Sequence, residues 1–486
     1  MTLPASALNL NLIIAAPEMV FFALLSFIMI ADLFTAPARR EAQLFFGSLI
    51  ALLITACLVV AQTPEAPQYA FNGMFVVDGL ATLLKVCLLL AVALVIVYSR
   101  AYLVARNLFT GEFITLVLFA TFGMMIMVSA HHFVSLYLGL ELLALSSYAL
   151  VALNRDSVAA SEAAMKYFIL GALASGLLLY GLSMVYGATG SLDVAQVFKV
   201  VSNSRANDPL VTFGLVFVVA GLAFKLGVVP FHMWVPDVYQ GAPTAMTLFI
   251  GSAPKIAAFG FVLRILAGSL GGATADWQDM LIVLAMLSIA VGNIVAIAQT
   301  NLKRMLAYST ISHMGFLLLG ILAGTRNGYA SGMFYAITYV LMTLGAFGMI
   351  LLLSRAGFEA EQLDDFRGLN KRSPWYAFLM LILMFSMAGI PLTAGFFAKF
   401  SVLEAALNAG YTWLVVFAVL MSVIGAFYYL RIVKLMYMDE PQDTNPILAG
   451  AGMHMALSVN AMALLILGLL PGGLMNACVS AIARSL

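Results

Sequence analysis

Four lysines of this chain lie inside apolar runs, where a charged side chain is unfavourable. They are Lys166, Lys225, Lys255 and Lys399. A lysine at the centre of a bilayer costs roughly 2.5–3.5 kcal/mol on insertion scales, so four cost on the order of 10 kcal/mol. Burial favours the neutral amine, which can then gain and lose a proton near neutral pH. The four residues predict a proton relay, and buried structural ion pairs are the alternative.

Carboxylates are scarce in the same runs. Glu141, in LYLGLELLALSSYALVAL, is the one acid that the sequence places deep within a helix. Because one carboxylate cannot neutralise four amines, we expect the other lysines to be neutral or hydrated by internal water. Two further basic residues, Lys85 and Arg264, stand nearer to helix ends. We expect their side chains to extend to the membrane interface.

Prolines accompany two of the lysines. Pro230 follows Lys225 in AFKLGVVPFHMW, and Pro391 precedes Lys399 in AGIPLTAGFFAKF. Proline removes a backbone hydrogen bond and interrupts a helix. Unwound backbone at membrane depth is tolerated only where protein covers it or where it lines a hydrated cavity. Two interruptions beside two lysines favour a hydrated pathway, whereas a packing kink is the alternative for either proline alone.

The elements that carry these residues are expected to be membrane helices. Hydrophobic residues make up 63% of the 486 residues and charged residues only 9%, against about 25% charged in a soluble domain. Runs of about 20 apolar residues span a bilayer as helices, so we expect an all-α integral membrane protein with about fourteen transmembrane helices. The expected spans are 10–34, 43–62, 75–99, 112–130, 132–152, 162–187, 208–229, 243–267, 277–299, 304–324, 328–353, 375–401, 411–434 and 449–470.

The distribution of lysine and arginine indicates the orientation. With the N-terminus outside, thirteen of the 23 basic residues fall in inside loops and four in outside loops, which leaves six within helices. Because inside loops are enriched in basic residues, both termini are expected on the outside.

The two interrupted helices, the seventh and the twelfth, are five helices apart. This layout predicts two five-helix repeats, helices 4–8 and 9–13, which are inverted because the fourth helix begins inside and the ninth outside. The expected division is 1–104 for three N-terminal transmembrane helices, 105–270 for the first repeat, 271–436 for the inverted second repeat and 437–486 for a C-terminal transmembrane helix.

Four segments resemble the antiporter-like subunits of respiratory complex I and the related large subunits of multisubunit sodium/proton antiporters. They are LYLGLELLALSSYALVAL, AFKLGVVPFHMWVPDVYQGAPT, GSAPKIAAF and NLKRMLAYSTISHMGF. The resemblance extends over nearly the whole chain, and the FHxWxPDxYxGAPT pattern is highly specific. Residues 367–400 are most similar to the N-type subunits. M-type subunits normally have glutamate at the position of Lys399, and L-type subunits carry a long C-terminal amphipathic helix that is not expected here.

The resemblance implies a proton channel built from two half-channels. Its relay would consist of Glu141 paired with Lys225, then Lys255, and Lys399 on the exit side. His313, in STISHMGF, would bridge Lys255 and Lys399, and a hydrogen-bonded packing role is its alternative. Lys166 would influence the Lys225 pair.

The resemblance also implies where cofactors and partners lie. The sequence has no Rossmann glycine pattern, CxxCH motif or cysteine cluster, so no cofactor is expected in this chain. Flavin, iron–sulfur clusters and quinone would belong to partner subunits of a bacterial inner-membrane NADH:quinone oxidoreductase. The neighbours would be the antiporter-like subunit M, the small subunits A, J and K, and the lipid bilayer. Because the net charge is only +1, we expect no nucleic-acid partner.

Three functions stay open at this point. The first is proton translocation driven by redox chemistry in other subunits. The second is sodium/proton exchange as the large subunit of a multisubunit antiporter, and the third is a structural membrane scaffold. Sodium prefers oxygen ligands, so a relay rich in lysine favours protons.

Overall fold

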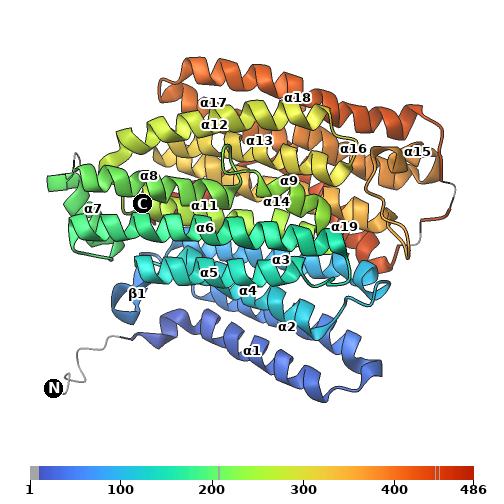
Figure 1. Cartoon of the computed structure of the whole chain (residues 1–486), viewed down its shortest axis with the longest axis horizontal. Coiled ribbons are helices and arrows are strands. Elements are labelled where there is room, and N and C mark those ends of the chain that lie inside the picture. Colours follow the sequence, from blue (N-terminus) through green and yellow to red (C-terminus); the bar gives the residue numbers. More distant parts are fainter. Residues whose placement is uncertain (1–9, 206–207, 444, 448) are drawn as a thin grey trace.

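Long helices lie side by side across the molecule, and short loops join most of them (Figure 1). The computed structural model describes residues 10–205, 208–443, 445–447 and 449–486. In this part of the chain, thirteen helices are long and apolar enough to cross a membrane. Helices satisfy their own backbone hydrogen bonds, as lipid requires. The chain is a multi-pass helical membrane protein, as the sequence predicted.

The first six spans are uninterrupted helices. They are α1 (Ala16–Phe34), α2 (Pro37–Ala61), α3 (Gly79–Val104), α4 (Gly111–Ser129), α5 (Phe133–Val151) and α6 (Val158–Thr189). Several begin at a side chain that accepts a hydrogen bond from the first turn, an arrangement that satisfies an otherwise free amide. Asp78 does so for α3, accepting from the amide of Ala81 at 2.8 Å.

The seventh span is interrupted, as predicted. Its first half, α8 (Pro209–Leu226), ends at Gly227, where φ is 81°. Its second half is α9 (Trp234–Gly241). A Cβ atom at Gly227 would lie 2.7 Å from Val235 Cγ2, so only glycine fits both the left-handed turn and the close return of the chain. The helix therefore ends before Pro230 is reached.

The eighth span, expected as one helix, has a short interruption at Ser252. It consists of α10 (Thr244–Gly251) and α11 (Ala253–Leu266). The whole span is buried within the protein. It therefore lies inside the bundle rather than against lipid, and it carries Lys255 near the start of α11.

The later spans include one more interruption. They are α12 (Thr274–Ile297), α13 (Leu302–Leu322), α14 (Arg326–Leu353), the pair α16 (Pro374–Ala388) and α17 (Ala394–Asn408), α18 (Thr412–Met438) and α19 (Ala451–Leu469). Between α16 and α17, Gly389 has a φ of 82° and its added Cβ would lie 2.8 Å from Lys399 Cδ. The predicted break in the twelfth span is confirmed, and glycine again ends the first half, ahead of Pro391.

Short elements beside the long helices complete the fold, and two of them, residues 12–15 and 75–77, stand where the sequence predicted the first turns of membrane helices. The short elements are the hairpin β1 (Gln68–Ala70) and β2 (Phe75–Val77), the helices α7 (Val194–Val200), α15 (Leu369–Arg372) and α20 (Gly472–Ala483), and the turns Leu12–Ala15, Phe71–Gly73, Val201–Arg205, Gly271–Ala273 and Leu363–Phe366. The two strands are antiparallel, with Gln68 opposite Val77. Helix α20 packs against α3 and α14.

Burial distinguishes the central helices from the peripheral ones. In Figure 1, α1 lies along one side of the bundle and α18 along the opposite side. Only about a third of the membrane-spanning part of α1 and of α18 is buried within the protein. The span formed by α10 and α11 is almost wholly buried, as are helices α13 and α14. The exposed apolar faces are suited to lipid or to neighbouring membrane subunits. The buried centre is where the candidate site lies.

Candidate functional site

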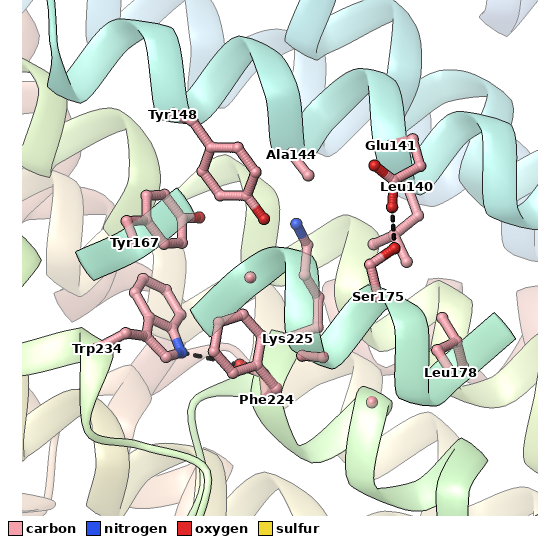
Figure 2. A pocket seen from close by; sticks show the side chains of 13 residues that line it. Leu140, Glu141, Ala144, Tyr148, Tyr167, Ser175, Leu178, Phe224, Lys225 and Trp234 are labelled. Atoms are coloured by element: carbon pink, nitrogen blue, oxygen red, sulfur yellow. Dashed lines mark hydrogen bonds between the residues drawn. The ribbon is translucent and has the colours of Figure 1, made fainter. Parts of the chain in front are cut away.

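Helices α5, α6, α8 and α9 enclose a cavity that contains Glu141 and Lys225 (Figure 2). Tyr148, Tyr167 and Trp234 form an aromatic side of this cavity. The volume open to the centre of a water molecule is about 20 Å³, and one water needs about 10–15 Å³. The cavity therefore has room for a water molecule beside the Lys225 amine.

Glu141 and Lys225 share this cavity without forming an ion pair. Among the described residues, the partner of the Glu141 carboxylate is the hydroxyl of Ser175, which donates a hydrogen bond to it. Ser175 Oγ also lies 3.0 Å from Tyr137 Oη. The structure thus holds the two groups apart, where the family resemblance implied a pair.

Lys255 lies at the break of the seventh span. Its side chain is only 2% exposed, and Nζ donates a hydrogen bond to the carbonyl oxygen of Leu226 at 2.8 Å. Leu226 is the last residue of α8, and the last carbonyls of a helix have no partner within it. The ring of Trp234 lies 5.4 Å from Nζ, within the range of a cation–π contact. The interruption therefore supplies an acceptor to Lys255, not to Lys225.

Lys399 has the same arrangement at the break of the twelfth span. Its Nζ donates to the carbonyl oxygen of Ala388 at 2.9 Å and to Ser422 Oγ at 3.0 Å. Ala388 is the last residue of α16, and the ring of Phe316 lies 5.1 Å from Nζ. In both places an amine lies against the C-terminal end of a half-helix. Aligned peptide dipoles provide partial negative charge at that end without a carboxylate.

Hydroxyl groups surround His313 at the centre of α13. Its Nδ1 lies 2.6 Å from Tyr335 Oη on α14, and its Nε2 lies 3.2 Å from Tyr429 Oη on α18. Tyr429 Oη is in turn 2.5 Å from Ser309 Oγ. Imidazole and hydroxyl groups can both donate and accept hydrogen bonds, as proton transfer along a chain requires.

Lys166 lies in the first third of α6, apart from the buried residues Lys255 and His313. Its Nζ is 2.9 Å from a carboxylate oxygen of Glu162 and 2.9 Å from one of Asp237. Its side chain is 44% exposed. Lys166 is therefore paired with two carboxylates, so the expectation that every lysine other than the partner of Glu141 is neutral or held by internal water is wrong for this one.

The site consists of groups suited to acid–base chemistry. Within the described ranges, no three histidine, cysteine, aspartate or glutamate side chains are placed to hold a metal ion. Cys57, Cys87 and Cys478 are not joined in disulfides. The available chemistry is the exchange of protons among amines, one carboxylate, one imidazole and hydroxyl groups.

Known proteins share both the sequence and the fold of this chain. The model of the family described as NADH:quinone oxidoreductase/Mrp antiporter, TM, matches residues 130–425. The chain is 61% identical to NADH-quinone oxidoreductase subunit N of Thiobacillus denitrificans, over 97% of each chain. The chain belongs to the NADH-quinone oxidoreductase subunit N family.

Solved structures extend this relation. A chain of respiratory complex I from Thermus thermophilus superposes with a TM-score of 0.81 at 32% identity, covering 95% of this chain and 100% of that one. A chain of the Mrp complex from Dietzia sp. DQ12-45-1b superposes with a TM-score of 0.83 at 22% identity, covering 96% and 97%. The second likeness shows the fold alone.

The segment matched by the family model begins just before α5 and includes all of the candidate site except Tyr429, which lies just beyond its end. The segment contains Glu141, Lys166, Lys225, Lys255, His313 and Lys399, together with both interrupted spans. Helices α1 to α4 lie outside it. The match therefore describes the candidate site of this subunit N family member but not its four N-terminal helices.

Two buried ion pairs involving these N-terminal helices correct the sequence analysis. Lys85 is 2% exposed, and its Nζ lies 2.5 Å from a carboxylate oxygen of Glu18. Arg264 is 4% exposed, and its guanidinium donates to both carboxylate oxygens of Asp78 at 2.6 and 2.8 Å. The prediction that Lys85 and Arg264 reach the interface is wrong. Both are structural, and the second pair joins α3 to α11.

Several site residues carry no distinctive signal in the sequence. They are Tyr137, Ser175, Ser422 and Tyr429, which occur as ordinary polar residues in apolar helices. Their partners come from other helices, so their roles depend on packing that residue spacing does not determine. Trp234 is different, because it is part of the FHMWVPD segment and could have been singled out.

Proposed function

We propose that this chain moves protons across the membrane as subunit N of an NADH:quinone oxidoreductase. The observation that carries the proposal is the way Lys255 and Lys399 are held, each by the terminal carbonyl of an interrupted helix. Structural cations elsewhere in the chain, Lys85 and Arg264, have carboxylate partners instead. An amine with a neutral partner is free to exchange its proton.

The proposed path begins at Glu141 and Lys225, continues to Lys255 and leaves through Lys399. Two unit charges 4 Å apart attract by about 4 kcal/mol at an effective dielectric constant of 20, which shifts a protonation equilibrium about a thousandfold. Approach of Glu141 would thus hold a proton on Lys225, and separation of the two would release it.

His313 is the proposed bridge to Lys399. Its hydrogen bonds to Tyr335 and Tyr429 support that role. Lys166 would act indirectly, through Asp237, rather than carry the proton.

The division into 1–104, 105–270, 271–436 and 437–486, with inverted repeats in the middle two parts, is also proposed. Two features support it. Each of the two middle parts contains one interrupted span whose first half ends at a glycine with positive φ, Gly227 or Gly389. In each, the last carbonyl of that half binds a lysine amine.

The proposed setting follows from the family. Flavin, iron–sulfur clusters and quinone would be held by partner subunits, and subunits M, A, J and K would be the neighbours in the membrane. The complex would lie in a bacterial inner membrane with both termini of this chain on the periplasmic side. The excess of basic residues in the expected inside loops supports that orientation.

Substitution of Lys255 tests the proposal. In inverted membrane vesicles that contain the whole complex, Lys255→Ala is expected to lower the number of protons taken up per NADH oxidised. Lys371→Ala is the matched control, since Lys371 is 54% exposed and paired with Glu440 at the surface. Its proton uptake should equal that of the unmodified complex.

The same vesicles separate the alternatives. Normal proton uptake by an assembled complex carrying Lys255→Ala would indicate a membrane scaffold instead. Proton movement that requires sodium, and stops when potassium replaces it, would indicate sodium/proton exchange.

A further inference from the structure

Helix α9 is a short segment that ion pairs hold from both sides. It connects to non-helical backbone at each end, 227–233 before it and 242–243 after it. Asp237, at its centre, lies 2.9 Å from Lys166 Nζ on α6 and 2.9 Å from Arg304 Nη1 on α13. Because neither end continues into the same helix, the position of α9 depends on such lateral contacts.

The two ion pairs lie at a polar cavity that water can enter. The cavity volume is about 260 Å³ for the centres of water molecules, and its polar lining consists of Glu162, Lys166, Asp237, Gln240, Arg304 and Glu361. Asp237 is 33% exposed. Partly exposed ion pairs are weak and respond to salt. The Asp237 contacts therefore hold α9 with a small free energy that a change in local charge can offset.

One helical turn before Asp237, Trp234 contacts several neighbouring elements. Its Nε1 donates a hydrogen bond to the carbonyl oxygen of Phe224 at 3.0 Å. Its ring stacks on Tyr167 with centroids 4.6 Å apart, and it lies 5.4 Å from Lys255 Nζ. Figure 2 shows the indole at the edge of the cavity that holds the Lys225 amine.

The indole therefore separates Lys225 from Lys255. One part of the ring lines the Lys225 cavity and the ring also contacts Lys255. Indole has a donor and no acceptor, so it cannot pass a proton along. Its N–H also donates to the Phe224 carbonyl in the last turn of α8, which accepts from the amide of Gly227 as well.

We propose that Asp237 is a positioning residue that sets the place of α9 and so opens or closes the Trp234 partition between Lys225 and Lys255. The proposal rests on the proton path described above. When the contacts to Lys166 and Arg304 weaken, α9 moves, the indole leaves the Phe224 carbonyl, and water enters between the two amines. The charge at the polar cavity around Asp237 then controls proton transfer between Lys225 and Lys255 inside the membrane.

The expected effect is a change in passive proton leak. Loss of two partly exposed ion pairs shifts the docking equilibrium of α9 by about tenfold. Leak through an open partition is proportional to the population of the undocked state. Asp237→Asn is therefore expected to raise the leak about tenfold and to lower proton uptake per NADH.

The experiment uses the whole complex in proteoliposomes. Leak is measured as the decay of an imposed pH gradient without NADH, and uptake with NADH. Asp237→Asn and Trp234→Leu should both raise leak, and Asp237→Glu should restore it. Their double variant should leak no more than Trp234→Leu alone, because both act through the indole. Asp364→Asn is the control, since it removes a surface ion pair with Arg367 that does not touch α9.

Each outcome decides the matter. Normal leak and normal uptake per assembled complex in Asp237→Asn would overturn the proposal, even if less complex assembles. If Asp237→Asn does not assemble, Trp234→Phe decides, because phenylalanine keeps the stacking and lacks the N–H. Raised leak in that variant supports the partition, and normal leak overturns it. Normal uptake in Lys255→Ala would instead overturn the relay itself.

Discussion

At the scale of single residues, buried cations in this protein are of two kinds. Lys85 and Arg264 have carboxylate partners, whereas Lys255 and Lys399 have carbonyl and hydroxyl partners. All lie in apolar sequence, so the sequence alone indicates that each is unusual without indicating which kind it is. The decisive partner of Lys85 is Glu18, more than sixty positions earlier in the chain, and only packing brings the two together.

The Glu18–Lys85 pair gives a stability prediction at this scale. Glu18→Gln leaves a buried ammonium group without its counter-charge, which destabilises a protein by roughly 3–5 kcal/mol. We expect less assembled complex and a lower thermal-inactivation temperature, with unchanged proton uptake per assembled complex. The double variant Glu18→Leu/Lys85→Met removes both charges and should recover most of the loss. Normal thermal stability of Glu18→Gln alone would contradict the structural role of the pair.

At the scale of elements, interrupted helices position the site. The sequence correctly predicted breaks in the seventh and twelfth spans, because prolines are visible in it. It did not show that glycine ends each first half, or that the freed carbonyl binds Lys255 or Lys399. Nor did it show the break at Ser252. Positive φ and close approach of chains are consequences of tertiary packing.

Alanine at Gly227 tests the first of these breaks. A non-glycine residue in the left-handed region costs roughly 1–2 kcal/mol, and overpacking against Val235 adds about 1–3 kcal/mol. Gly357→Ala is the matched control, because Gly357 has a φ of 75° with no atom within 4 Å of an added Cβ. We expect a clearly larger fall in thermal-inactivation temperature for Gly227→Ala. Equal falls for the two variants would show that the Val235 contact relaxes without penalty.

At the scale of the whole molecule, the sequence predicted the class and the spans, whereas its assignment of the relay residues stays a prediction. Hydropathy is a local property, and a lysine in lipid is recognisable by its cost alone. The pairing of helices is not local. The separation of Glu141 from Lys225 and the polar cavity around Asp237 could therefore not be predicted from the sequence. The long loop after α18 shows the same limit, because ion pairs to distant segments hold it.

The Asp443 side chain of that loop gives a prediction with pH. Burial alone would raise its pKa, but hydrogen bonds from Asn445 and Arg355 and the charge of Arg372 lower the pKa of Asp443 to about 2. Because the pKa of Asp443 is lowered, its ion pairs stabilise the loop fully at pH values above its unfolded-state pKa of about 3.9. This stabilisation is lost as the pH falls through about 2.

We therefore expect protease cleavage of residues 439–450 to be constant between about pH 8 and pH 5, where Asp443 stays ionised. Asp443→Asn should accelerate cleavage, because it removes contacts at 2.8 Å to Arg355 and 3.4 Å to Arg372. Glu440→Gln, which alters an exposed pair with Lys371, should have little effect. Cleavage that rises between pH 8 and pH 5 in the unmodified chain would contradict the assignment.

The carbonyl partners of Lys255 and Lys399 have a consequence for genetic dissection. Every residue type has a main-chain oxygen, so substitution of Leu226 or Ala388 leaves the acceptor atom present. Scanning mutagenesis can therefore remove either lysine, and the Ser422 hydroxyl beside Lys399, but never the main-chain acceptor. Only changes to the main chain itself reach that half of the contact, such as a residue inserted after Leu226 or an ester bond in place of an amide.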